Sequence, residues 1–171
     1  MNLMEYIREV HNFPKEGILF RDITTVLKDP KALAFAMDGM VRLASTLNFD
    51  AVLGPESRGF IFGVPVALRL GKGFIPIRKD GKLPAKTRRK EYALEYGNAT
   101  IEIHEDAITE GNRYVIVDDL LATGGTAKAA ASLIAEMGGI LVAHVFFIEL
   151  AELKGRDVLS GQEVRSFIVY N

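Results

Sequence analysis

The chain has 171 residues, of which 49% are hydrophobic and 25% are charged, an ordinary composition for one globular domain. The formal net charge is −1, so no whole-molecule attraction to nucleic acid or to an acidic membrane is expected. The absence of cysteine excludes a disulfide scaffold, a thiolate zinc site and a cysteine nucleophile. No apolar run reaches the ~20 residues that span a bilayer, and the N-terminus lacks the apolar core of a signal peptide. We therefore expect a cytoplasmic protein with no membrane partner.

The first fifty residues predict two helices separated by an extended segment. Apolar residues recur at helical spacing over residues 1–11, which indicates a short amphipathic helix. Residues 18–23 are expected to form a short extended segment or a turn. Asp29 then offers an N-cap before Pro30 at the first helical position, and this helix is expected to run to about Leu47.

From residue 51 onward, apolar strands alternate with helices, with one charged interruption. The interruption, Lys79–Lys90, has no apolar period and is expected to be a loop. Residues 92–96 and 100–103 are expected to form a hairpin around Gly97-Asn98. The expected strands are 51–53, 74–77, 113–117 and 140–148, and the expected helices are 59–70 and 124–137. This order predicts an α/β fold with a mainly parallel central sheet flanked by helices, in which ligands bind at the carboxyl ends of the strands.

The strongest motif follows the buried strand at 113–117. It reads Asp118-Asp119-Leu120-Leu121-Ala122-Thr123-Gly124-Gly125-Thr126. Backbone N–H groups in a glycine-rich turn that opens a helix can converge on a phosphate, and adjacent carboxylates suit ribose hydroxyls. The plainer alternative is a strand–turn–helix connection with a polar cap. A Walker loop and a G-x-G-x-x-G turn after a strand are both absent from the sequence.

This motif resembles the PRPP-binding motif of type I phosphoribosyltransferases. Other segments, in the same order, resemble the adenine phosphoribosyltransferases in particular: Phe20–Ile23, Val26–Pro30, Gly54–Phe60, Ile77–Pro84, Leu94–Gly97 and Leu153–Arg156. The similarity covers nearly the whole chain. It implies a single phosphoribosyltransferase domain over 1–171, with a small N-terminal hood over about 1–35 and a flexible catalytic loop at 79–96.

The resemblance also assigns binding roles. The residues expected at the 5-phosphate are Ala122, Thr123, Gly124, Gly125 and Thr126, and those at the ribose are Asp118 and Asp119. The pyrophosphate of PRPP is assigned to Ser57, Arg58, Arg78, Lys79 and Lys82, and the adenine to Leu19, Phe20, Arg21 and Leu120. Simple core packing is the alternative for Phe20 and Leu120. For the outer basic cluster, Lys86–Lys90, a solvated surface or a nucleic-acid patch is the alternative.

The activity implied by the resemblance is purine salvage, in which adenine and PRPP give AMP and pyrophosphate. Glu95, Arg58 and Tyr96 are the residues expected in catalysis, with Glu95 managing the proton of the adenine imidazole edge. Mg²⁺ is expected to be held mainly through PRPP or pyrophosphate, with no metal site made of protein ligands. The family is usually homodimeric, and a cis peptide often occurs at the position of Glu56–Ser57. Two alternatives stay open: a 6-oxopurine phosphoribosyltransferase, and a PRPP-sensing regulator without catalysis.

Overall fold

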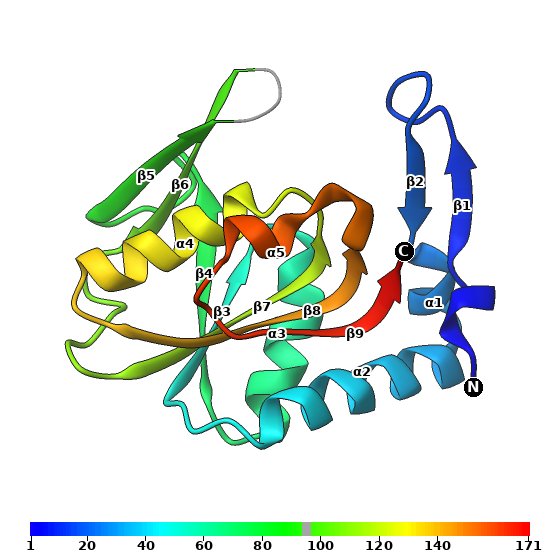
Figure 1. Cartoon of the computed structure of the whole chain (residues 1–171). Coiled ribbons are helices and arrows are strands. Elements are labelled where there is room, and N and C mark those ends of the chain that lie inside the picture. The colour runs from blue at the N-terminus through cyan, green and yellow to red at the C-terminus, as the bar shows by residue number, and fades with distance from the viewer. Residues whose placement is uncertain (94–96) are drawn as a thin grey trace. The chain divides into compact units, whose positions relative to one another are not determined.

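The computed structural model describes residues 1–93 and 97–171, and its chain forms two compact units, Met1–Gly39 and Met40–Asn171. The first unit begins with a short 3₁₀ turn, η1 (Leu3–Glu5), and an antiparallel pair, β1 (Arg8–His11) and β2 (Leu19–Asp22). Helix α1 (Thr24–Lys28) and the start of α2 (Pro30–Ser45) follow (Figure 1).

The helix expected over residues 1–11 is therefore wrong beyond its first turn. Leu3 and Ile7 are both buried, which accounts for their apolar spacing, but Arg8–His11 pairs residue by residue with β2. Strand pairing outweighs a helical pattern of only three apolar residues, because local propensity is a weak prior. The extended segment at 18–23 is confirmed as β2.

The predicted start of α2 is confirmed in detail. Asp29 Oδ1 accepts hydrogen bonds from the backbone N–H groups of Lys31 (2.9 Å) and Ala32 (2.8 Å), which satisfies two donors of the first helical turn. Pro30 occupies the first helical position, where its missing N–H has no consequence. The helix ends at Ser45, two residues before the expected end.

The second unit is built on a sheet which, within the described residues, has the strand order β5-β6-β4-β3-β7-β8-β9 (Figure 1). Strands β4, β3, β7, β8 and β9 run parallel, while β5 and β6 form an antiparallel hairpin at one edge. The bounds are β3 (Ala51–Pro55), β4 (Gly73–Lys79), β5 (Thr87–Ala93), β6 (Asn98–His104), β7 (Arg113–Leu121), β8 (Ile140–Leu150) and β9 (Val164–Tyr170). The predicted α/β class with a mainly parallel sheet is confirmed.

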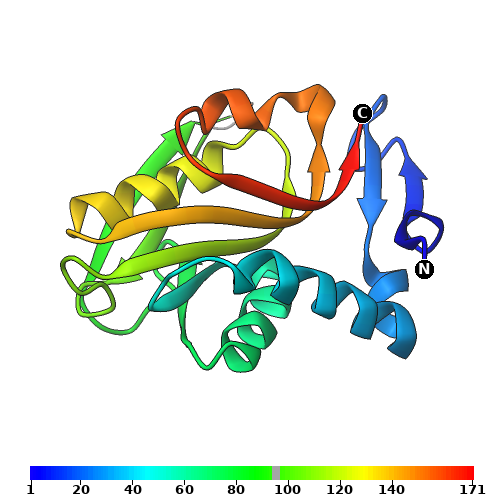
Figure 2. The same ribbon diagram turned by 60° about the horizontal axis from the view of Figure 1, so that its bottom comes forward.

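Helices cover both faces of this sheet (Figure 2). Helix α4 (Gly125–Glu136) buries Leu133 and Ile134 against side chains of one face, among them Ile116 of β7. On the other face lies α3 (Arg58–Arg69), whose Phe62 stacks on Phe147 of β8 with ring centroids 4.7 Å apart. A short turn η2 (Ala151–Leu153) and helix α5 (Gly155–Val158) connect β8 to β9. Burial on both faces explains why the central strands read as continuous apolar runs.

Three predictions about the strands need correction. Residues 87–90, expected in a loop, belong to β5, which pairs with β6 from Thr87↔His104 to Ala93↔Asn98. As an edge strand with mostly exposed charged side chains, β5 has no apolar alternation to reveal it. An antiparallel hairpin is present, but Asn98, expected in its turn, pairs with Ala93, and residues 94–96 of the expected first strand lie outside the described residues. Strand β7 continues four residues past Val117, and β9 was not predicted. Movement of the 79–96 segment stays a prediction.

Candidate functional site

A cavity of about 460 Å³ in the second unit opens at the carboxyl ends of β3, β4 and β7. Three polar segments follow these strands in the sequence, at 54–58, 78–79 and 118–126. They meet there because parallel strands end at the same edge of the sheet. The lining residues are Pro55, Glu56, Ser57, Arg58, Ile77, Arg78, Lys79, Tyr92, Ile101, Asp118, Asp119, Leu120 and Thr126. This wall combines cations with a carboxylate pair, which suits a ligand that carries both phosphate and hydroxyl groups.

A smaller cavity of about 90 Å³ lies beside the first, at the amino end of α4. It is lined by all residues from Leu120 to Ala127, together with Asp118 and Phe146, and it shares Asp118, Leu120 and Thr126 with the larger cavity. Gly124 has φ +83°, a left-handed conformation that turns the chain from β7 into the helix. The first N–H groups of α4 and the helix dipole favour an anion at this point.

Two adjacent carboxylates stand between the cavities. Asp119 is only 7% exposed, and its Oδ2 lies 2.7 Å from Arg58 Nε at the start of α3. Asp118 Oδ1 accepts a hydrogen bond of 2.8 Å from the backbone N–H of Asp119. Gly59 makes this close approach possible, because a Cβ there would lie 2.9 Å from Asp118 Oδ1. The pair presents carboxylate oxygens to the cavity at a fixed position.

The pKa values of both carboxyls are raised from the ordinary aspartate value of 3.8. For Asp118 the cause is burial, followed by the charge of Asp119, and the pKa rises well above 3.8. For Asp119 burial also raises the pKa, and Arg58 opposes the rise. Ionising the pair therefore costs the folded protein free energy, a cost that a cationic or hydroxyl-bearing ligand would offset.

We expect Asp118→Asn to raise the melting temperature near pH 7. A carboxyl whose pKa is raised on folding destabilises the native state once the pH exceeds its unfolded pKa, and asparagine lacks this ionisation. The gain should grow as the pH rises from about 4 to the raised pKa and should vanish at lower pH. Each kcal/mol relieved corresponds to about 2–4 °C. Thermal melts from pH 3.5 to 8 test this, and a lower melting temperature at pH 7 would contradict it.

Glu56 orients Arg78 and Lys79, which form the cationic wall of the larger cavity. Its Oε2 accepts from Arg78 Nε at 2.7 Å and from the backbone N–H of Lys79 at 3.0 Å. The hydrogen bond from Arg78, and then that from Lys79, lowers the pKa of Glu56, so this side chain is an anion that orients the end of β4. The Glu56–Ser57 peptide is cis, as the resemblance implies. Arg78 was predicted at the site from the sequence, whereas its partner Glu56 was not.

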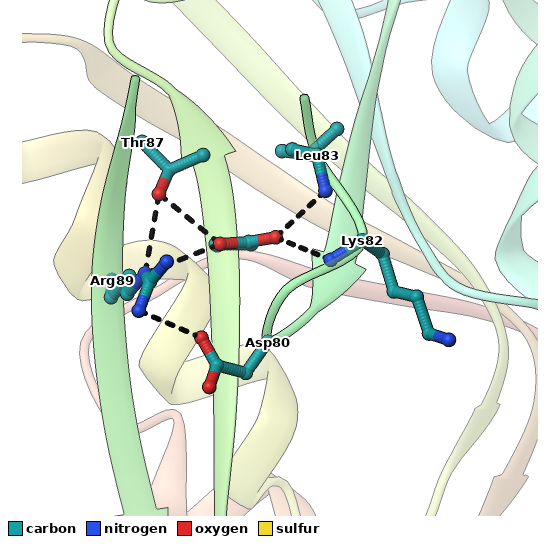
Figure 3. A network of polar contacts seen from close by, with 6 residues as sticks. Asp80, Lys82, Leu83, Thr87 and Arg89 are labelled. Atoms are coloured by element: carbon teal, nitrogen blue, oxygen red, sulfur yellow. Dashed lines mark hydrogen bonds and ion pairs between the residues drawn. The ribbon is translucent and has the colours of Figure 1, made fainter. Parts of the chain in front are cut away.

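The hairpin beside this wall is tied down by Glu102, a fully buried carboxylate of β6 (Figure 3). Oε1 accepts 2.9 Å hydrogen bonds from the backbone N–H groups of Lys82 and Leu83, and Oε2 accepts one of 3.1 Å from the Thr87 hydroxyl. Arg89 Nε lies 3.3 Å from Oε2, and its Nη1 lies 3.1 Å from Asp80. We call these six residues the Glu102 clamp. It joins the turn after β4 to both strands of the hairpin.

Replacement of Glu102 by Gln should destabilise the protein by about 1–3 kcal/mol, because a buried charged acceptor is lost. Burial raises the pKa of Glu102, but hydrogen bonds from Leu83, Thr87 and Lys82 and the charge of Arg89 outweigh it, so the pKa lies below 4.5. Glu102 therefore contributes stability above pH 4.5 that disappears as the pH falls through the lowered pKa. Urea unfolding at several pH values measures this. Equal stability of E102Q and wild type at pH 7 would refute the clamp.

Other residues predicted at the site lie in different places. Lys82 is not among the lining residues of either cavity, and in Figure 3 its side chain points away from the carboxylate that its backbone N–H contacts. Of the adenine residues, Leu120 lines both cavities of the second unit, whereas Leu19, Phe20 and Arg21 lie on β2 of the first unit, each partly buried. Phe20 packs edge-on against Phe13, with ring centroids 5.2 Å apart. Glu95 and Tyr96 lie outside the described residues.

Helix α5 packs against the turn at Ala122–Thr126, which we call the phosphate turn after the role that the sequence predicts for it. A Cβ on Gly155 would lie 2.4 Å from the backbone oxygen of Ala122, so the two backbones are in close contact. Arg156 fastens α5 to the sheet through a bidentate ion pair with Glu149 (2.6 and 2.8 Å) and a hydrogen bond of 3.0 Å to the backbone oxygen of Val164. In the sequence, residues 153–156 are only a point of resemblance, and this contact was not predicted.

In the part of the chain that the structure describes, no three His, Cys, Asp or Glu side chains are grouped so that they could hold a metal ion. The helices within residues 1–93 and 97–171 are all too short or too polar to span a lipid bilayer.

Comparison with known proteins identifies the family. A model of the phosphoribosyl transferase domain matches residues 23–169. Adenine phosphoribosyltransferase of Clostridium perfringens is 55% identical, over 100% of this chain and 99% of the relative. The crystal structure of the enzyme from Thermoanaerobacter pseudethanolicus has a TM-score of 0.96 at 50% identity and covers 98% of both chains. That from Saccharomyces cerevisiae, in complex with adenine and an imino-altritol bisphosphate, has a TM-score of 0.90 at 38% identity over 96% of each chain. With the fold and the acidic pair above a glycine-rich turn, these similarities show that the chain belongs to the phosphoribosyltransferase family and is an enzyme of the adenine phosphoribosyltransferase group.

Proposed function

We propose that the protein transfers the 5-phosphoribosyl group of PRPP to N9 of adenine, giving AMP and pyrophosphate. The observation that carries the proposal is the meeting of an acidic pair, a phosphate-sized turn and a cationic wall around one pair of adjoining cavities. The names of the full-length relatives support adenine as the acceptor. Ordering these groups before substrate arrives favours reaction by orientation and electrostatic stabilisation, without a protein nucleophile.

The donor would lie across both cavities. Its 5-phosphate would occupy the smaller one, against the N–H groups and hydroxyls of Ala122–Thr126, and its ribose hydroxyls would donate to Asp118 and Asp119. Its pyrophosphate would face Ser57, Arg58, Arg78 and Lys79 in the larger cavity, where charge builds up on the leaving group. Lys82 would reach it only through movement of the turn after β4.

Mg²⁺ would enter as part of the substrate complex. Hard oxygen donors suit this ion, which keeps several waters and binds through one or two carboxylates and substrate phosphates. Asp118 and Asp119, which line the larger cavity together with Glu56, could accept from its water shell. Bound to the diphosphate, the ion would neutralise part of the leaving group's charge.

By the family resemblance, the residues proposed to contact the adenine are Leu120, Leu19, Phe20 and Arg21. Stacking on an aromatic side chain gives affinity for any purine, so a hydrogen-bond acceptor at a defined position is needed to select the 6-amino group. Tyr96 would close over the ribose or the pyrophosphate, excluding water that would hydrolyse PRPP.

A homodimer is also proposed, on the family resemblance, and sedimentation equilibrium measures it.

The decisive assay supplies PRPP and Mg²⁺ with each purine base in turn and measures the nucleotide formed. We expect AMP from adenine and little product from hypoxanthine or guanine. Turnover of a 6-oxopurine without turnover of adenine would reject the proposed acceptor, and no nucleotide from any base would reject the proposed reaction.

Replacing Glu95 by Leu should lower kcat by about 10²–10⁴-fold, the usual contribution of general acid–base help. The melting temperature should change little if Glu95 acts on the substrate proton. A kcat equal to that of wild type would show that another group, or water, takes the proton. The Glu91→Leu variant, with a change of the same kind on β5, serves as the control.

A further inference from the structure

Tyr92 of β5 lines the larger cavity and hydrogen-bonds to the phosphate turn. Its Oη lies 3.1 Å from Thr126 Oγ1, which donates to it in the structure. The contact joins the edge hairpin to the first turn of α4, across 34 residues of sequence. None of the site assignments drawn from the sequence includes Tyr92.

The ring of Tyr92 is held in place by packing. It lies against the buried cluster beneath α4, and a Cβ on Gly125 would lie 3.6 Å from its Cδ2. The same Cβ would lie 3.7 Å from the backbone oxygen of Ala93, so the end of β5 covers the amino end of α4. The hydroxyl therefore reaches Thr126 from a fixed direction and needs little ordering to make its hydrogen bond.

Hydroxyl chemistry suggests what this contact does. Thr126 has one proton to donate and two lone pairs that can accept, and so does Tyr92. A phosphate oxygen can only accept, so binding of a 5-phosphate directs the Thr126 proton to the phosphate. Tyr92 Oη, no longer the acceptor, can then donate to Thr126 Oγ1 and keep that proton aimed at the ligand.

We propose that Tyr92 is a positioning residue for the 5-phosphate, acting through Thr126 and linking occupancy of the phosphate turn to the seating of the β5–β6 hairpin. This inference rests on the proposed function, in which Thr126 binds the 5-phosphate. It makes a prediction specific to that phosphate. Loss of the Tyr92 hydroxyl should weaken the binding of ligands that carry the 5-phosphate and should leave the binding of ligands without it unchanged.

The first test compares Tyr92→Phe with wild type in steady-state kinetics. The KM for PRPP should rise about 3- to 10-fold, the size of one neutral hydrogen bond, while kcat and the KM for adenine stay close to wild type. By calorimetry the Kd for AMP should rise by the same factor, whereas that for adenosine, which lacks the phosphate, should not change. Equal loss for AMP and adenosine would overturn the inference.

The second test asks whether the effect passes through Thr126. In a Thr126→Val background, Tyr92→Phe should change the KM for PRPP less than 2-fold, whereas in Thr126→Ser, which keeps the hydroxyl, the full 3- to 10-fold rise should return. An unaltered effect in the Val background would show that Tyr92 acts independently of Thr126 and would overturn the proposal.

A matched control removes a tyrosine hydroxyl elsewhere. Tyr114 Oη accepts from the backbone N–H of Thr109 at 2.8 Å in the core, so Tyr114→Phe should lower the melting temperature without altering the KM for PRPP. If wild-type protein forms no AMP, the proposed function fails. If it forms AMP and Tyr92→Phe matches it in KM and Kd, only the assignment of Tyr92 fails.

Discussion

Asp119→Asn should lower kcat/KM for PRPP by about 100-fold while the protein stays folded. The change keeps the shape of the side chain but removes a charge that accepts from Arg58 and, in the proposed complex, from a ribose hydroxyl. Hydrogen bonds to charged groups contribute about 1.5–3 kcal/mol, and 1.4 kcal/mol corresponds to tenfold in a rate or binding constant. The KM for adenine should change much less, because the base does not contact this carboxylate in the proposed complex.

The exposed Asp106, on the turn after β6, provides the control for Asp119→Asn. Asp106→Asn changes the net charge equally and should leave kcat/KM at the wild-type value. Circular dichroism and thermal melts establish that both variants are folded. A folded Asp119→Asn enzyme with wild-type kcat/KM for PRPP would remove the ribose role from this residue.

Gly155→Ala should lower kcat/KM for PRPP by about 100-fold as well, although Gly155 lines neither cavity. The added methyl would lie 2.4 Å from the backbone oxygen of Ala122 and 2.7 Å from Leu121 Cδ1, so the phosphate turn has to move. A displacement of about 1 Å at a binding group can cost 10²-fold in rate. Overpacking should also reduce stability by about 1–3 kcal/mol, or roughly 2–12 °C in melting temperature.

Gly73, the first residue of β4, offers the matched substitution. A Cβ there would meet no atom within 4 Å, so Gly73→Ala should change neither the stability nor the kinetics appreciably. Kinetics at saturating adenine, with PRPP varied, separate the two variants. If Gly155→Ala binds and uses PRPP as wild type does, the turn tolerates displacement and α5 has no role in shaping it.

The sequence predicts the centre of the molecule better than its edges, and the reason is burial. Strands buried on both faces, such as β7 and β8, have apolar runs, and the cap at Asp29 has a local chemical signature. Edge strand β5 lacks both kinds of signal, since its hydrogen bonds to β6 depend on a partner that follows later in the chain. Strand β1 was misassigned for the same reason, because its pairing with β2 is not encoded within residues 1–11.

The residues of the candidate site were likewise predicted where the sequence signal is local and missed where it depends on distant partners. Residues 118–126 follow one another along the chain, so a motif was enough to select them as site candidates. Asp118, Asp119, Leu120 and Thr126 line the larger cavity with the ends of β3 and β4, and all residues of the segment except Asp119 line the smaller one. Glu56, Tyr92 and Glu102 gain their importance from partners 22, 34 and up to 20 residues away, which no local pattern reveals.

The contact between α5 and the phosphate turn also bears on when the protein becomes competent during synthesis. The turn at Ala122–Thr126 leaves the ribosome well before Gly155, and α5 is fastened only once Arg156 can reach Glu149 and the start of β9. Synthesis proceeds from the N-terminus, and domains fold as units. We therefore expect a nascent chain halted before β9 to carry the residues proposed to contact the phosphate and still to bind a sugar phosphate poorly, so that the proposed activity would begin only when β9 joins the sheet.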